Sequence, residues 1–307
     1  TSARRGNRKM SLQVYGEVNK AVVHWSEGKD NETRVIENSM SSTRFGFMGE
    51  AKFSPQWKAG YRMEFGLDLA EDVVPFVRHS YWWIEAPAGR MSMGRTSMAA
   101  DNIGGITVAS IDVAAKMLTV TGSMFEAGAM FHDIRRNIVR YDTPSMGGFI
   151  ASASWANPDT GDKHPYDVAI RYAGEFSGFR VAAGGGLSQQ DHGLETINLA
   201  AETRKRVIAG SASMMHLESG LFINVAAGDL KEDTGFGGDA RVYHTQAGWQ
   251  RNIFGVGSTA IFGEYAVTRT KGADEKPNLL GAGITQSIDA AAMDIYLNWR
   301  RFDNDVK

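Results

Sequence analysis

The sequence predicts an all-β protein whose strands form a transmembrane antiparallel β-barrel, and three observations carry this prediction. Apolar and polar residues alternate with a period of two over segments of about ten residues, as between Lys58 and Asp68. The alternation recurs along nearly the whole chain, with charge on many polar positions. Short turns and longer polar segments separate the candidate strands in a regular order. A membrane barrel turns its apolar face outward to lipid and keeps a polar lumen, which this pattern fits.

Composition narrows the class of protein further. The 307 residues include 35 glycines, seven prolines and no cysteine, which suits many strands and turns and excludes a disulfide framework or a thiol nucleophile. The net charge of -2 argues against nucleic acid as a partner, because phosphate-binding domains carry a strong basic excess. The mean hydropathy of -0.28 is compatible with a barrel, since every second strand residue faces water.

The chain is expected to form one domain over residues 1–307. Residues 1–9 carry charge but no apolar core, so we expect a solvated arm and an export signal that has already been removed. Strand candidates begin at Leu12–Trp25 and end at Met293–Phe302, about fifteen in all. Bacterial barrels have an even number of strands, so sixteen are expected, with the closing C-terminal strand absent from this sequence.

The connections between strand candidates fall into two classes. Tight turns are predicted at Ser54–Gln56, Pro87–Gly89, Pro144–Gly147, Glu175–Gly178 and Glu218–Gly220. Longer polar loops are predicted at Ser26–Glu32, Asn157–Pro165, Ser188–Glu202, Asp229–Asp239 and Thr270–Pro277. In an outer-membrane barrel the short turns face the periplasm and the long loops face outward.

One connection, residues 97–133, is too long for a simple loop. It follows the strand candidate Arg90–Thr96, and in a wide barrel a connection of this length has room to fold into the lumen. Its single lysine is outnumbered by acidic residues, which are Asp101, Asp112, Glu126 and Asp133. We therefore expect an acidic connection that folds into the lumen.

Several segments resemble Gram-negative general porins of the alphaproteobacterial, trimeric type. They are Val14–Asn19, Ser41–Gly49, Gly94–Arg95, Asn137–Pro144 and Ile288–Trp299, in the order expected for the family. The resemblance implies a sixteen-stranded barrel in the bacterial outer membrane, a homotrimer surrounded by lipid and lipopolysaccharide, and an inward-folded third loop. One feature departs from the family pattern. Chains of the family end in a closing strand with a C-terminal aromatic residue, whereas this sequence ends at Asp303–Lys307, as expected if the closing strand is missing.

Strand parity identifies the charges that would face the lumen. Apolar neighbours such as Phe45 and Phe47 take the lipid side, so the candidate basic wall is Arg44, Arg62, Arg90, Arg136 and Arg140. Arg171 and Arg180 also point inward, on strands farther along the barrel. Opposite an acidic loop, this cluster would create a transverse field that orients small polar solutes. The alternative is that the inward charges merely hydrate a water-filled lumen.

No candidate catalytic or metal site emerges, so we expect neither enzyme activity nor a cofactor. The seven histidines are far apart and none belongs to a His-Glu-x-x-His motif. The favoured function is passive diffusion of small hydrophilic solutes and ions. A substrate-selective channel would need a run of inward aromatic residues, but Trp82, Phe262 and Tyr296 do not form one. An outer-membrane barrel enzyme and a soluble multi-stranded binding protein are the remaining alternatives.

Overall fold

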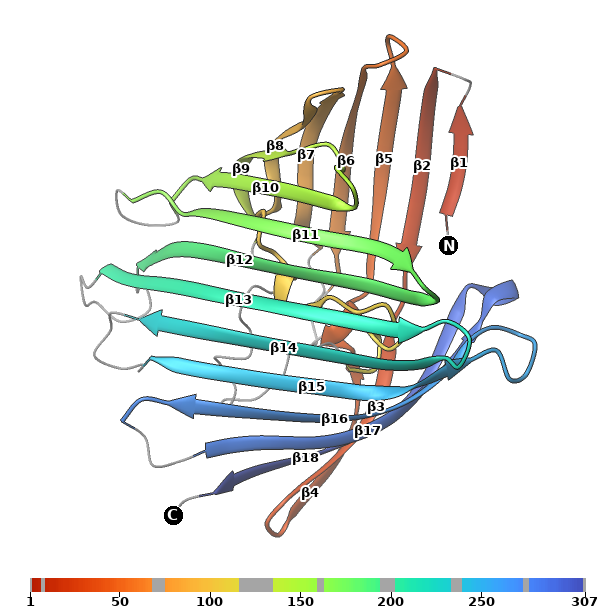
Figure 1. Cartoon of the computed structure of the whole chain (residues 1–307), viewed down its shortest axis with the longest axis vertical. Helices are drawn as coiled ribbons and strands as arrows, with labels where there is room; N and C mark the ends of the chain where they lie inside the picture. Colours follow the sequence, from red (N-terminus) through yellow and green to blue (C-terminus); the bar gives the residue numbers. More distant parts are fainter. Residues whose placement is uncertain are drawn as a thin grey trace.

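A single antiparallel sheet dominates the computed structural model, which describes residues 2–6, 9–67, 75–115, 135–158, 163–193, 202–232, 239–272 and 276–305. Within these ranges the sheet contains 16 strands in chain order, from β1 to β18 without β3 and β4 (Figure 1). Its first half consists of β1 (Ser2–Gly6), β2 (Met10–Glu17), β5 (Arg44–Lys52), β6 (Lys58–Gly66), β7 (Phe76–Ala86), β8 (Gly89–Ser97), β9 (Arg135–Asp142) and β10 (Phe149–Ala156). Its second half consists of β11 (Tyr166–Phe176), β12 (Phe179–Gly193), β13 (Glu202–His216), β14 (Leu221–Glu232), β15 (Ala240–Arg251), β16 (Thr259–Thr270), β17 (Lys276–Ile288) and β18 (Met293–Asp305).

The predicted alternation of apolar and polar residues determines the two faces of the sheet. Along β15, Tyr243 is exposed while Val242 and His244 on either side of it are buried. The register joins Tyr61 to Trp82 and Trp82 to Met93, so large apolar side chains form continuous rows on the outer face. The all-β, antiparallel fold predicted from the sequence is confirmed.

The tight connections have turn geometry that matches their sequence. Between β11 and β12, Ser177 and Gly178 have φ angles of 48° and 81°. Positive φ at both central residues is the requirement of a type I′ hairpin turn, whose twist matches that of paired strands. The paired Phe176 and Phe179 on either side of the turn begin the ladder.

Two features near the N-terminus differ from the sequence prediction. Residues 2–6 pair with β2 instead of forming a solvated arm. The expected strand Leu12–Trp25 is divided, because β2 ends at Glu17 and β3 (Lys20–Glu27) pairs with β4 (Asp30–Glu37) in a separate hairpin. The period-two pattern continues through both segments, so periodicity alone could not show that the chain leaves the main sheet.

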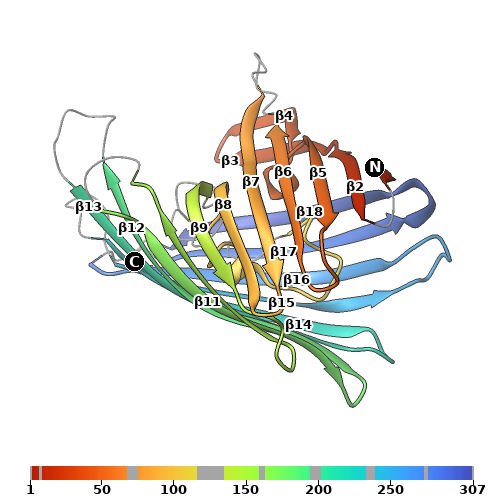
Figure 2. The ribbon, with the colours of Figure 1, turned by 90° about the horizontal axis from the view of Figure 1, so that it is seen from above.

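The sheet curves around a segment that follows β8. In Figure 1, β5–β8 lie at the top and β14–β17 at the bottom, with the yellow segment after β8 between them. The same curvature is seen from above in Figure 2. This segment includes the short 3-10 helix η2 (Ile103–Gly105), which contacts β12, β13 and β14. Within the described ranges, no helix is both long and apolar enough to cross a membrane.

Candidate functional site: a charged wall and an inward segment

Residues 98–115, here called the inner segment, run along the concave face of the sheet. At its start, the backbone N–H groups of Ala99 and Ala100 donate to the carboxylate of Asp167 on β11, at 3.1 and 2.7 Å. Farther along, the N–H groups of Ile106 and Val108 donate to Ser211 and Ser213 of β13, at 3.1 and 2.9 Å. Side chains that project from the inner face therefore hold the segment by its backbone.

Apolar packing supplements these hydrogen bonds. Ala100 and Ile103 pack against the inner face of β11–β15, in a buried cluster completed by Ala169, Val207, Ala209, Ala226, Leu230, Ala240 and Val242. A second cluster joins Ala109, Ile111, Ala114 and Ala115 to Met215, Phe222, Ala260 and Phe262. We call the inner face of β11–β16 the covered wall. Its apolar inward residues avoid water because the inner segment covers them.

Glycines on β12 permit the close approach of the inner segment. A Cβ atom added at Gly184 would lie 2.7 Å from the Cδ1 atoms of both Ile103 and Ile106. One added at Gly186 would lie 3.1 Å from the Cβ atom of Ala100. Both contacts are closer than ordinary van der Waals packing, so the absent side chains make room for the segment.

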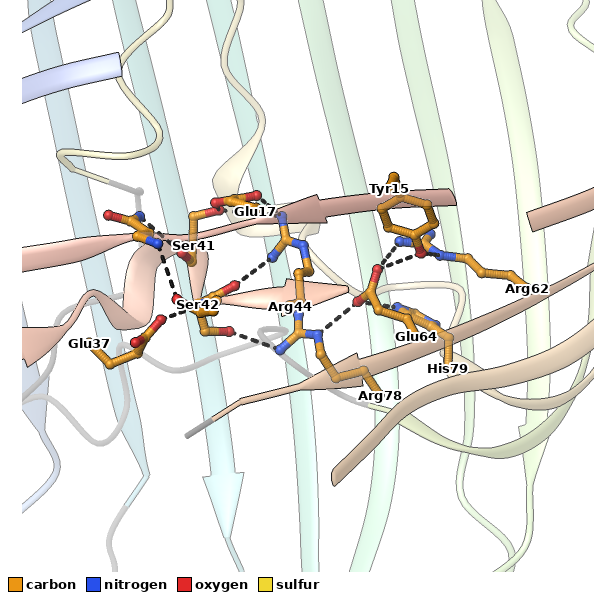
Figure 3. Close-up of polar contacts among 12 residues, drawn as sticks. Tyr15, Glu17, Glu37, Ser41, Ser42, Arg44, Arg62, Glu64, Arg78 and His79 are labelled. Atoms are coloured by element: carbon orange, nitrogen blue, oxygen red, sulfur yellow. Dashed lines mark hydrogen bonds and ion pairs between the residues drawn. The ribbon is translucent and has the colours of Figure 1, made fainter. Parts of the chain in front are cut away.

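The inner face of β5–β9, here called the charged wall, has a different character. At its centre the Glu64 carboxylate binds three side chains (Figure 3). Tyr15 donates its hydroxyl to Glu64 at 2.8 Å, and Arg78 donates Nε at 2.8 Å. Arg62 donates to both Glu64 and the Tyr15 oxygen. Two arginines therefore surround one buried carboxylate.

A register shift in the sheet contributes to this cluster. The pairing of β6 with β7 shifts between Glu64 and Phe65, so Glu64 pairs with His79 while Phe65 pairs with Val77. The shift brings Arg78 and His79 close to the same carboxylate, with His79 Nε2 at 3.8 Å from Glu64 Oε1. A bulge can re-aim a side chain in this way, which strict parity does not predict.

Arg44 lies beside the Glu64 cluster, near the base of the β3–β4 hairpin. It binds Glu17 at 2.7 Å and Ser41 at 3.3 Å. At the hairpin base, Glu37 pairs with Lys20 and accepts the backbone N–H of Thr43. Burial raises the pKa of Glu37, but these contacts outweigh it and hold the pKa below its ordinary value.

The other three predicted arginines occupy separate positions on the inner face. Arg140 forms a bidentate pair with Asp142 and donates to the carbonyls of Ser97 and Met98, where the inner segment begins. Arg90 pairs with Glu85 at 2.5 Å and lies 4.3 Å over the ring of Trp83. Arg136 is buried and faces Thr96 across the strand pair. The five residues thus form a series of local ion pairs and contacts along β5–β9.

The predicted acidic residues are distributed unevenly. Asp101 is half-buried on the inner segment, and its backbone carbonyl accepts a hydrogen bond from Arg171 at 2.8 Å. Asp112 is exposed. Glu126 and Asp133 lie outside the described residues. The described half of the predicted loop is therefore mainly apolar, since its buried residues are alanine, isoleucine, methionine and glycine.

Several residues of the site were not predicted as part of it. Arg171 was assigned to a more distant strand, but the inward path of the chain brings Asp101 to it. Glu64 and Tyr15 lie on the polar face by parity and were recognisable as inward, whereas the contact of Arg78 with Glu64 depends on the bulge. Trp82, expected inward, is exposed on the outer face in the same row as Tyr61 and Met93.

A second buried glutamate lies on the covered wall. Glu264 of β16 binds Arg300 of β18 at 2.6 Å and His244 of β15 at 3.2 Å, and Glu264 and His244 are fully buried while Arg300 is 12% exposed. Gln246 donates to Glu264 at 3.3 Å and to the carbonyl of Ala115 at 2.8 Å. Among the described residues, no group of three or more His, Cys, Asp or Glu side chains is placed to hold a metal ion.

Comparison with known protein families shows which family the chain belongs to. Residues 2–307 match the family model of the Gram-negative porins. The chain belongs to the Gram-negative porin family. This porin is therefore an outer-membrane protein of a channel-forming family, and the enzyme and soluble-protein alternatives are set aside.

Similarity to an individual curated relative covers only about half of the chain. The porin is 30% identical over 177 residues to the major outer membrane protein P.IB of Neisseria sicca, a match that covers 53% of this chain and 47% of that protein. The porin thus spans about half the length of this curated relative.

Solved structures share the fold over nearly the whole chain. The anion-selective porin from Comamonas acidovorans superposes with a TM-score of 0.74 at 20% identity, covering 96% of this chain and 90% of that one. The trimer form of OmpT from Vibrio cholerae has a TM-score of 0.68 at 16% identity, with 96% and 89% covered. At these identities the likeness concerns the barrel fold alone.

Proposed function

We propose that this porin forms a water-filled channel through which small hydrophilic solutes and ions diffuse passively. One observation carries the proposal: a segment of the chain is held inside the curved sheet, opposite a wall lined with paired charges. A pore needs a narrow place and a shaped electric field, and it needs no catalytic group. The exposed apolar residues of the outer face supply the surface that contacts lipid.

The constriction is proposed to lie between the charged wall and the loop formed by residues 97–133. The anchored inner segment and the apolar contacts beneath it support this placement. Solutes would pass along β5–β9, where Arg62 keeps part of its side chain exposed while Glu64 is buried. Asp101 and Asp112 would contribute the opposing acidic charge, together with Glu126 and Asp133.

We further propose weak charge selectivity with a preference for anions. The Glu64 cluster contains two arginines for one carboxylate. Arg171 donates to a neutral backbone carbonyl at 2.8 Å. Both features leave positive charge on the inner face, and the field at a constriction sets ion preference more than the net charge of the chain does.

A homotrimer is the proposed assembly. Membership of the porin family supports it, and the OmpT structure that shares this fold is a trimer form. Separation of the unheated protein on a denaturing gel is expected to show one band at about three times the monomer mass, which disappears on boiling. A monomer band alone from folded protein would contradict the trimer.

Planar-bilayer recording tests the channel proposal directly. Full-length protein in a potassium chloride gradient is expected to give current steps that close in three levels. The reversal potential is expected to be displaced from zero toward the equilibrium potential of chloride. The absence of channels from protein shown to be folded would overturn the proposed function. A reversal potential displaced toward the equilibrium potential of potassium would overturn only the proposed preference for anions.

Anchoring of the loop requires a separate test. Asp167→Ala removes the carboxylate that accepts the N–H groups of Ala99 and Ala100, so larger polyethylene glycols are expected to enter the pore. Asp229→Ala is the matched control, because Asp229 pairs with the largely exposed Arg241 away from the inner segment. Unchanged exclusion in Asp167→Ala would contradict the proposed constriction.

A further inference from the structure

Three consecutive backbone carbonyls near the end of the inner segment are each bound by a side-chain amide. Asn38 donates to the carbonyl of Val113 at 2.7 Å, Asn298 to Ala114 at 2.7 Å, and Gln246 to Ala115 at 2.8 Å. The donors come from three parts of the fold, namely the end of the β3–β4 hairpin, β18 and β15. We propose that Asn38, Gln246 and Asn298, here called the amide clamp, are positioning residues that fix residues 113–115 and so help to set the constriction.

The hydrogen bonds of Asn38 determine its orientation. Its Oδ1 accepts the backbone N–H of Met40 at 3.0 Å. Its Nδ2 donates both to Val113 and to the hydroxyl of Tyr296 at 2.8 Å, and Tyr296 in turn donates to Asn19 at 2.9 Å. A side-chain amide has two donor hydrogens and one acceptor oxygen, so both hydrogens and the oxygen of Asn38 form hydrogen bonds. A side chain held in this way cannot rotate without losing several bonds at once.

The clamp joins the β3–β4 hairpin to the inner segment. At the hairpin base, the N–H of Asn38 donates to the carbonyl of Asn19, and the N–H of Asn19 donates to Thr43 Oγ1. Both asparagines are buried, where a broken hydrogen bond costs more than it would in water. A shift of the hairpin base would therefore be transmitted to Val113.

The chemistry of the clamp suits a device that positions the backbone. Amides donate hydrogen bonds without adding charge, so they fix the segment without changing the electric field of the pore. Gln246 is itself held, because its Oε1 accepts from Asn224 at 3.1 Å and its Nε2 also donates to Glu264 at 3.3 Å. Loss of the clamp is thus expected to change the motion and width of the constriction but not its ion preference.

Cysteine labelling tests the clamp without relying on channel function. The chain has no native cysteine, so Ala114→Cys introduces a single thiol at a buried position. We expect a methanethiosulfonate reagent to modify this thiol at least about tenfold faster when Asn38→Leu or Asn298→Leu is added, because local opening controls access to a buried group. Asn298→Leu is the milder variant, since the Asn298 Oδ1 atom accepts no hydrogen bond among the described residues.

The matched control is Gln13→Leu, which removes an amide from β2. Gln13 lies on the same face as Tyr15 and has no hydrogen bond to the inner segment among the described residues. We expect the control to leave the labelling rate unchanged. Equal labelling rates in Asn298→Leu, Gln13→Leu and the unaltered background would overturn the clamp, whether or not Asn38→Leu folds.

Single-channel recording then tests the link to the pore, which rests on the proposed function. In the variants without the cysteine, loss of the clamp is expected to increase open-channel noise and admit larger polymers while the reversal potential stays constant. Faster labelling without these changes would uphold the clamp and overturn its role in conduction. A changed reversal potential would contradict the inference that the clamp acts through position rather than charge.

Discussion

The two walls of this porin each bury a glutamate, yet they place it in opposite circumstances. Glu64 on the charged wall is bound by Arg62 and Arg78, and the Arg62 side chain is 31% exposed. Glu264 on the covered wall is bound by Arg300 and His244, and these side chains are 12% and 0% exposed. The first ion cluster is partly exposed through Arg62, whereas the second is linked through Gln246 to the inner segment that covers its wall. Similar residue types are therefore partly exposed on one wall and enclosed on the other.

The comparison shows why inward charge alone does not identify pore-lining residues. Strand parity places Glu64 and Glu264 equally on the inner face. Only the path of the inner segment separates them, because Gln246 links Glu264 to the carbonyl of Ala115. A charge contributes to ion preference when solute can approach it, and burial of an ion pair instead makes the loss of one partner costly.

The largest expected effect comes from Glu264→Ala. The substitution leaves Arg300 nearly buried without its carboxylate, so the free energy of unfolding should fall by about 3–5 kcal/mol. Urea unfolding in lipid vesicles, followed by tryptophan fluorescence, measures the change. Asp303→Ala is the control, because it breaks an exposed pair with Arg301 and should cost less than about 1 kcal/mol. An equal decrease in the free energy of unfolding for both variants would contradict the proposed difference between the two walls.

Glu64→Gln is expected to shift ion preference toward anions. The change removes the single carboxylate that two arginines share on the charged wall. The anion-to-cation permeability ratio should rise about twofold, measured from the reversal potential in a salt gradient. Glu264→Gln removes the same charge beneath the inner segment and should shift the ratio less. A larger shift from Glu264→Gln would mean that the solute path follows the other wall.

Arg62→Gln should move the preference in the opposite direction. It removes a partly exposed positive charge, while Arg78 remains to bind Glu64 at 2.8 Å. The expected fall in the same permeability ratio is somewhat smaller, about 1.5-fold, because the cluster becomes neutral rather than acidic. Arg301→Gln is a charge-matched control on a largely exposed side chain of the outer face. Equal effects of both substitutions would show that the ratio follows total charge.

The smallest expected effect is that of Gly184→Val. The added side chain would press against the tips of Ile103 and Ile106, so we expect these side chains to rotate and the inner segment to move slightly away from the covered wall. Single-channel conductance should fall by less than about a third, since the segment would move toward the proposed solute path along the charged wall. Gly263→Val is the control, because a Cβ there meets its nearest atom at 3.8 Å. A fall in both variants would contradict this explanation.

Strand parity and connection lengths made much of the fold predictable. Parity requires only local alternation, so Phe45 and Phe47 were placed outward and Arg44 inward from the sequence alone. The unusual length of residues 97–133 marked the connection that contains the inner segment. The apolar character of inward positions such as Val207 and Phe262 was a further signal of something covering them, but it becomes clear only once the segment is placed.

The remaining features depend on contacts between distant parts of the chain. The Tyr296–Asn38 hydrogen bond joins residues 258 positions apart, and no local pattern encodes it. Arg171 became part of the site because the segment carrying Asp101 folds back to it. The register shift that brings Arg78 to Glu64 breaks the alternation on which parity depends. Local periodicity thus predicts faces well and pairs of side chains poorly.

The hydrogen bonds that hold the inner segment are made almost entirely by its backbone, and this has a consequence for how the protein can change. The wall side chains bind N–H and carbonyl groups of residues 99–115, with Ser110 adding a side-chain contact to Gln250. Backbone groups are the same in every amino acid except proline, so replacing an exposed side chain of the segment leaves these backbone anchors in place. The side chains of the barrel wall determine the path of the segment. The exposed side chains of the segment can therefore vary, in evolution or by design, and change which solutes the proposed channel admits.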